Sequence, residues 1–227
     1  MNPDVLYEDN HLLVVVKPRN MPIMADDSGD PDLQSGLKAW LKEKYDKPGN
    51  VFLGIVHRLD RPVGGVMVLA KTSKAASRLS AQIRDQETGK VYRAIVHGVL
   101  ENTSGRLRDF LLKDDQTRNV SCVSQNTPGA KEALLDYEVL AHQPGMSMLR
   151  IRLQTGRPHQ IRVQLAHLGH PIVGDARYGR NTEPGTSIAL WCSIMEIDHP
   201  VSGARMRFVC DPPAIWPWLV FGPIREK

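Results

Sequence analysis

A short charged motif between two apolar runs holds the first residues that could do chemistry. The motif is His57-Arg58-Leu59-Asp60-Arg61, and Pro62 and Gly64-Gly65 follow it and mark a tight bend. The apolar runs, 51–56 and 66–70, predict two buried strands. A carboxylate flanked by arginines in a loop between buried strands is a rigidly held charged group, as reactive groups usually are. Taken alone, the motif favours a surface ion pair beside a turn, because short motifs have many false positives.

The same residues resemble the His-Arg-x-Asp sequence of a kinase catalytic loop. The chain has no Gly-rich phosphate loop upstream of Asp60 and no Asp-Phe-Gly downstream of it. The kinase interpretation therefore fails, and the motif needs support from elsewhere in the chain.

Composition sets the broad class of the protein. The chain has 227 residues, of which 41% are hydrophobic and 24% charged, which suits one globular domain or two small lobes. The 29 basic and 25 acidic residues give a net charge of +4, which permits nucleic-acid binding without demanding it.

Cysteine usage and the N-terminus indicate a cytoplasmic protein. The three cysteines, Cys122, Cys192 and Cys210, form no Cys-x-x-Cys pair, so we expect neither a disulfide framework nor a zinc site. The histidines also fit no familiar metal-binding spacing, and we expect no metal. No basic segment leads into a long apolar one, so we expect no signal peptide and no membrane helix.

Periodicity predicts an α+β chain with much antiparallel sheet. We expect a hairpin over 5–16, amphipathic helices over 32–45 and from Thr72 or Ser73 to Gly89, and a third helix after Pro158 that ends at Gly169. Strands are expected over the alternating or β-rich segments 91–97, 106–112, 119–124, 133–140, 148–155, 187–197 and 204–210. The segment 215–219 is expected to pack on the core.

A second charged region lies between Arg150 and Arg180. It contains six arginines, no lysine and one acid, Asp175, so its balance is six minus one, or +5. Arginine without lysine is typical of planar, bidentate recognition of phosphate or carboxylate.

Several motifs in one order now carry a family resemblance. They are His57-Arg58-Leu59-Asp60, Ala70-Lys71-Thr72, Lys90-Val91-Tyr92-Arg93-Ala94, Thr155-Gly156-Arg157-Pro158-His159-Gln160-Ile161-Arg162, and the run from Ala166 to Gly179. This set resembles the RluA-type RNA pseudouridine synthases over nearly the whole chain. The resemblance implies the pseudouridine synthase fold, a mixed, mostly antiparallel sheet with flanking helices and a central RNA-binding cleft. We expect one catalytic domain over 1–227, with no accessory RNA-binding domain before it.

The resemblance also implies roles for named residues. Asp60 matches the catalytic aspartate, Tyr92 the tyrosine that packs on the target base, and Arg162 the basic residue that pairs with the aspartate. Arg58 matches the arginine that fills the space left by the flipped base, and Ile161 fits an apolar wall of the uracil pocket. Substrate contacts are also expected from His57, Arg157 and His159.

The implied reaction isomerises a uridine in structured RNA to pseudouridine, and the base must first be flipped out of its helix. No group is added and no redox change occurs, so we expect no cofactor. Asp60 must be ionised, and a nearby Arg162 would favour the charged form. Attack on C1′, attack on the base and removal of a ribose proton all remain open as its role. Ribosomal and transfer RNA are both open as substrates, and a monomer is expected.

One departure and two alternatives accompany this interpretation. The family bend usually reads Thr-Ser-Gly, where this chain has Val63-Gly64-Gly65. The fold could serve as an RNA-binding module without catalysis, although an intact Asp60, Tyr92 and Arg162 argue against that. A glycoside hydrolase would need a second acid across a cleft, such as Asp175.

Overall fold

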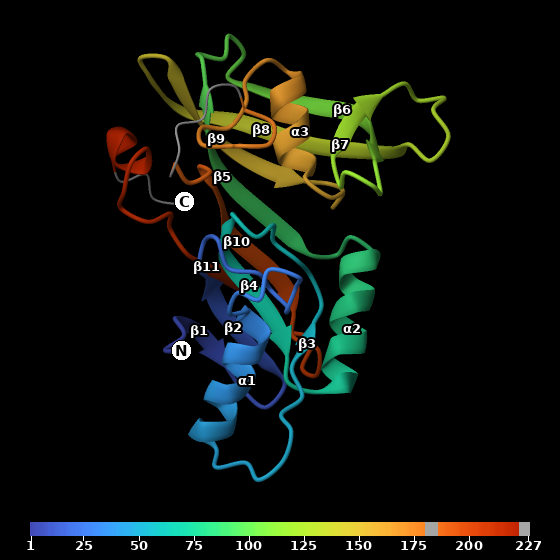
Figure 1. The fold of residues 1–227 in the computed structure, drawn as a ribbon, viewed down its shortest axis with the longest axis vertical. Helices are drawn as coiled ribbons and strands as arrows, with labels where there is room; N and C mark the ends of the chain where they lie inside the picture. Colours follow the sequence, from blue (N-terminus) through green and yellow to red (C-terminus); the bar gives the residue numbers. More distant parts are fainter. Residues whose placement is uncertain (180–185, 223–227) are drawn as a thin grey trace. The chain divides into compact units, whose positions relative to one another are not determined.

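The structure is a computed structural model that describes residues 1–179 and 186–222. The chain divides into two units, each with its own set of strands and helices (Figure 1). Unit 1 comprises Met1–Lys90 and Cys192–Asp211, and unit 2 comprises Val91–Trp191 and Pro212–Lys227. The composition permitted two lobes, and a single catalytic domain over 1–227 stays a prediction. Arg180, the last arginine of the basic region, lies outside the described residues.

Unit 1 is built on a sheet with the order β1-β2-β4-β10-β11, and β3 pairs with β4. Its elements are β1 (Val5–Glu8), β2 (Leu12–Lys17), α1 (Leu33–Lys44), β3 (Gly54–Ile55), β4 (Gly64–Ala70), α2 (Ser73–Arg84), β10 (Leu190–Asp198) and β11 (Arg205–Val209). The predicted hairpin is β1 and β2, which pair in antiparallel fashion. The predicted helix 32–45 is α1, capped by the Asp32 side chain, which accepts a hydrogen bond from the Ser35 amide.

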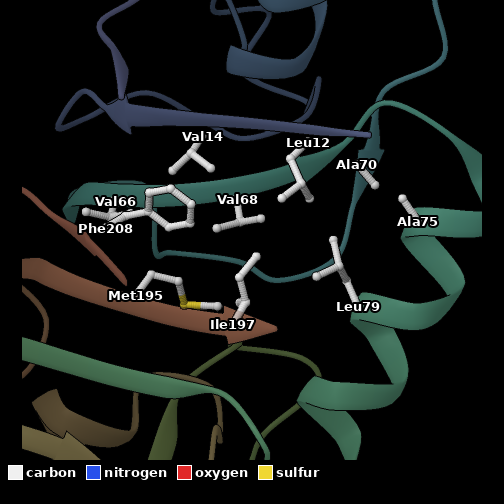
Figure 2. Packing of buried hydrophobic residues seen from close by; sticks show 10 residues of the cluster. All are labelled: Leu12, Val14, Val66, Val68, Ala70, Ala75, Leu79, Met195, Ile197 and Phe208. Carbon is white, nitrogen blue, oxygen red and sulfur yellow. The ribbon is translucent and has the colours of Figure 1, made fainter. Parts of the chain in front are cut away.

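The core of unit 1 lies between its sheet and α2 (Figure 2). Side chains from β2, β4, β10 and β11 meet Ala75 and Leu79 of α2, and all of them are buried. These two residues are four positions apart and therefore share one face of the helix. The helix begins where predicted, because the Thr72 hydroxyl accepts a hydrogen bond from the Ala75 amide at 3.2 Å. This packing fixes β4, the strand that follows the charged motif.

Unit 2 is an antiparallel sheet with the order β5-β9-β8-β6-β7. Its elements are β5 (Gly89–His97), β6 (Ser104–Lys113), β7 (Val120–Val123), β8 (Lys131–Gln143), β9 (Met146–Leu153), α3 (Gln160–His167) and a 3-10 helix, η1 (Trp218–Phe221). Val163 of α3 packs with Leu111, Val120 and Ala133 in a small buried cluster. The predicted mixed, mostly antiparallel architecture is confirmed.

Two local predictions were wrong, and a third was confirmed only in part. The run 51–56 forms only the two-residue β3. Leu53 is the one buried residue of this run, and Phe52 is 50% exposed. Gly89 does not end the second helix, which stops at Arg84, but begins β5. At the C-terminal end Trp218 is buried, whereas Trp216 and Leu219 are 55% and 62% exposed. Apolar composition alone overestimated burial in the first and last of these segments.

None of the helices in the described part of the chain is both long and apolar enough to cross a membrane.

Candidate active site

Asp60 lies in a turn that connects β3 to β4. The Val63 amide donates to the Asp60 carbonyl at 2.9 Å, which closes a four-residue turn with Asp at its first position. Leu59 and Val63 are buried, while Arg58 and Arg61 are exposed and Asp60 is partly buried. The apolar members of the motif therefore anchor the turn, and its two arginines are exposed.

Lys17 supports this turn by donating hydrogen bonds to its backbone. It is the last residue of β2 and is fully buried, although its side chain ends in an amine. Its Nζ donates to the carbonyl oxygens of Pro18 at 2.9 Å, Arg61 at 3.0 Å and Val63 at 2.8 Å. Burial lowers the pKa of Lys17 to about 7, and the nearby Asp60 carboxylate acts in the opposite direction. Lys17 is thus a positioning residue of the Asp60 turn, and sequence analysis had taken it only as the end of the hairpin.

His57 supports the same turn from its N-terminal side. Its Nε2 lies 2.9 Å from the Val68 amide of β4 and accepts that hydrogen bond, so the ring carries its proton on Nδ1. Burial, together with the positive charge of Lys90, lowers the pKa of His57 to about 3. The ring is therefore neutral and bound to the backbone. A contact between His57 and RNA stays a prediction, and the observed role is structural.

Gly65 allows β4 to approach β10 closely. Its φ is +121°, and a Cβ there would lie 2.6 Å from the backbone nitrogen of Cys192 and closer still to its carbonyl oxygen. Only glycine fits such a position. The bend residue shared with the family pattern is therefore needed for packing, while the effect of Val63 and Gly64 in place of Thr and Ser stays untested.

Arg61 braces a second loop against the turn. Its guanidinium pairs with Asp30, bonds the Ser28 hydroxyl at 3.1 Å and lies 3.8 Å from Asp26. Arg58 is also exposed, and its contact with RNA stays a prediction.

In unit 2, Arg162 is held by a buried carboxylate. Its Nε and Nη2 donate to the two oxygens of Asp175 at 2.8 and 2.7 Å, and its guanidinium lies over the Tyr178 ring, 5.1 Å from the centroid. Asp175 also accepts hydrogen bonds from the amides of Arg177 and Tyr178. Burial would raise the pKa of Asp175, but the hydrogen bonds and the charge of Arg162 hold it below its usual value. A carboxylate held ionised in this way is not a general acid, and both of its oxygens are already engaged by Arg162 and by two backbone amides.

The other predicted residues of unit 2 surround α3 or lie on β5. His159 has a left-handed backbone, with φ of 51°, just before α3, and its Nδ1 lies 2.6 Å from the Tyr178 hydroxyl. Arg157 donates from Nε to the Glu132 carbonyl at 2.9 Å. Ile161 is buried in α3, and Tyr92 is buried in β5, where it pairs with Ile151. Direct contacts of these side chains with RNA stay predictions.

The structure thus defines two groups of predicted residues. His57, Arg58 and Asp60 belong to one turn of unit 1. Arg162 and His159 both contact Tyr178 in unit 2, and Asp175 is the residue that orients Arg162. The pairing of Arg162 with Asp60 would join the two units and stays a prediction.

Comparison with known proteins identifies the family. Residues 11–167 match the family described as RNA pseudouridylate synthase, and the chain belongs to it. The chain is 34% identical to ribosomal large subunit pseudouridine synthase D of Yersinia pestis, over 90% of this chain and 66% of that protein. It is also 34% identical to the protein of the same name from Pseudomonas aeruginosa, over 96% of this chain and 70% of that one. The chain therefore spans about two thirds of the length of these relatives.

A solved structure supports the fold. Human RNA Pseudouridylate Synthase Domain Containing 4 is 22% identical and superposes with a TM-score of 0.78, covering 96% of this chain and 90% of that one. The predicted pseudouridine synthase fold is thereby confirmed.

Proposed function

We propose that this protein isomerises uridine to pseudouridine in RNA, with Asp60 as its catalytic carboxylate. The observation that carries the proposal is the support that buried side chains give to the Asp60 turn. This turn lies within residues 11–167, which match the family. A buried lysine bonds the backbone on the C-terminal side of Asp60, and a buried histidine anchors the chain before it. These contacts fix the backbone on both sides of a partly buried carboxylate. Catalysis requires a carboxylate that is held in place, whereas a solvated surface ion pair needs no such support.

The reaction breaks the bond between N1 of uracil and C1′ of ribose and then joins C5 of the base to C1′. The proton on C5 leaves to solvent and N1 gains one, so atoms balance without a co-substrate. Asp60 acts on the ribose or on the base, and Arg162 is proposed to keep it ionised in the assembled site. The proposed substrate is flipped out of its helix, Arg58 occupies the vacated space, and Tyr92 and Ile161 contact the uracil.

We infer ribosomal RNA as the first substrate to test. The support is the name of the two relatives, ribosomal large subunit pseudouridine synthase D. Transfer RNA is the second candidate, on the chemistry of the site alone. A monomer in the cytoplasm is also proposed, and three cysteines with no Cys-x-x-Cys pair suit a reducing compartment.

Release of tritium from C5 of labelled uridine tests the proposal. Ribosomal RNA and transfer RNA would be prepared separately from cells lacking this gene, so that the target site is unmodified. We expect release from ribosomal RNA by the wild-type protein and none by Asp60→Ala. Release from transfer RNA alone would replace the substrate assignment but keep the reaction. No release from either pool by a folded protein that binds RNA would contradict the enzyme and favour a binding module.

A further inference from the structure

Three side chains with metal-ligating atoms meet on one face of unit 2, and the proposed uridine chemistry uses none of them. Asp109 is on β6, Cys122 on β7 and His167 in the last turn of α3. One ligand atom from each lies within 4.8 Å of the other two. The separations of 13 and 45 positions along the chain fit no short sequence motif, which is why sequence analysis expected no metal.

Strand register and helix period explain why these residues converge. Cys122 pairs directly with Leu111, and Asp109 is two positions before Leu111, so all three side chains are on the same face of the sheet. The same face carries the apolar cluster onto which Val163 packs, and Cys122 itself contacts that cluster. His167 is four positions after Val163 and therefore lies on the helix face that meets the sheet. The cluster is fixed by tertiary packing and does not belong to a loose surface loop.

The groups around Asp109 resemble the surroundings of a metal ligand. Its Oδ1 lies 3.0 Å from His167 Nδ1, and its Oδ2 accepts from Gln164 Nε2 at 2.8 Å. Gln164 is 1% exposed and also donates to the Ala133 carbonyl at 3.2 Å. Its Oε1 is buried and has no hydrogen-bond partner among the described residues. A ligating carboxylate is typically oriented by such a hydrogen-bonding neighbour.

We propose that Asp109, Cys122 and His167 form a binding site for a zinc ion. Sulfur, nitrogen and oxygen donors together are a set that zinc accepts, whereas magnesium and calcium take oxygen alone. A thiolate and a carboxylate would together balance the two charges of the ion. Three protein ligands leave a fourth position, and the 60% exposure of the His167 side chain opens it to solvent.

The same residues could instead be read as a nucleophilic cysteine with a histidine and an aspartate. Burial and the negative charge of Asp109 raise the pKa of Cys122 to about 11, so the free thiol is protonated and a weak nucleophile. The raised pKa does not argue against a metal ligand in the same way, because a bound metal ion stabilises the thiolate directly.

The test is metal binding to the full chain after treatment with a chelator. Zinc titration should give one site, and cobalt in its place should give the near-ultraviolet charge-transfer band of a thiolate ligand. Cys122→Ser and His167→Ala should each weaken zinc binding at least about tenfold. Cys122→Ser should also abolish the cobalt band. Cys210→Ser is the matched control, since that thiol is in unit 1, and it should leave both signals unchanged.

Thermal unfolding gives a second readout. Zinc should raise the melting temperature of the wild-type protein and of Cys210→Ser, but not of Cys122→Ser or His167→Ala. The proposal is overturned if the wild-type protein binds no zinc. It is equally overturned if both variants bind zinc as tightly as the wild type, because the metal would then lie elsewhere.

Discussion

Lys17 Nζ donates a hydrogen bond to the carbonyl oxygen of Val63 at 2.8 Å, across 46 positions of sequence. Val63 is three residues after Asp60 and closes its turn through the Asp60 carbonyl. A fully buried lysine therefore binds the backbone of the turn that carries the candidate catalytic carboxylate. We expect the position of the Asp60 turn to depend on this contact.

Replacing Lys17 should loosen the turn and lower activity. Lys17→Met keeps the side-chain volume but leaves the carbonyls of Arg61 and Val63 without their donor. We expect the free energy of unfolding to fall by about 1–3 kcal/mol, with a loss of tritium release larger than the unfolded fraction explains. Urea unfolding and single-turnover assays measure the two effects. Lys42→Met, at an exposed position of α1, is the control. Wild-type stability and turnover in Lys17→Met would refute the positioning role.

Acid should destabilise the protein through His57. The unfolded chain takes up a proton on this residue near pH 6.5, while the folded chain does so only near pH 3. Between these values the unfolded state binds more protons, so the free energy of unfolding falls as pH falls, by about 1.4 kcal/mol per unit. His57→Gln cannot titrate and should show a smaller difference between about pH 7 and about pH 5 in urea unfolding. An identical pH dependence in the two proteins would mean that His57 is not the group responsible.

Gly65→Ala should be strongly destabilising. The new Cβ would overlap the backbone of Cys192, and the φ of +121° would strain any L side chain. We expect a loss of at least about 1–3 kcal/mol in the free energy of unfolding. Gly203→Ala is the matched control, because its φ of +74° is also positive but nothing lies within 4 Å of the added carbon. It should lose only the cost of the backbone conformation. Equal losses in both variants would show that contact with Cys192 is unimportant.

Asp175 and Arg162 should behave as a coupled pair. Asp175→Asn leaves a buried guanidinium without its carboxylate and should cost about 3–5 kcal/mol in the free energy of unfolding. The double variant Arg162→Met with Asp175→Leu should recover much of that stability but not the tritium release. Recovery of both would remove Arg162 from the proposed site, since the pair would then be only structural. Thermal unfolding alongside the tritium assay separates these outcomes.

Much of the fold could be predicted because its signals are local. The β1–β2 hairpin, the start of α2 at Thr72 and the five strands of unit 2 all follow from residue types and periodicity within short windows. The run 51–56 misled because apolar residues alone do not say whether a partner strand pairs over their whole length. Only Gly54 and Ile55 pair with β4.

Sequence analysis named candidate site residues, whose roles stay predictions, but it did not name the residues that support the Asp60 turn. Asp60, Tyr92 and Arg162 came from motif order, which reports family membership. Lys17 was missed because a charged residue at the end of a strand normally marks the surface. Its burial depends on carbonyls from positions 18, 61 and 63 that only the folded chain assembles. Asp109, Cys122 and His167 were missed for the same reason, since register and helix packing bring them together.

The central claim is that Asp60 is the catalytic carboxylate, and the rate of tritium release by Asp60→Asn tests it most directly. The substitution keeps the size of the side chain and removes its charge. Single-turnover rates on ribosomal RNA would be compared with those of the wild type and of Asp46→Asn, at an exposed position of unit 1. We expect Asp60→Asn to be slower by at least about a thousandfold with unchanged RNA binding, and Asp46→Asn to match the wild type. Release by Asp60→Asn within about tenfold of the wild type would contradict the assignment.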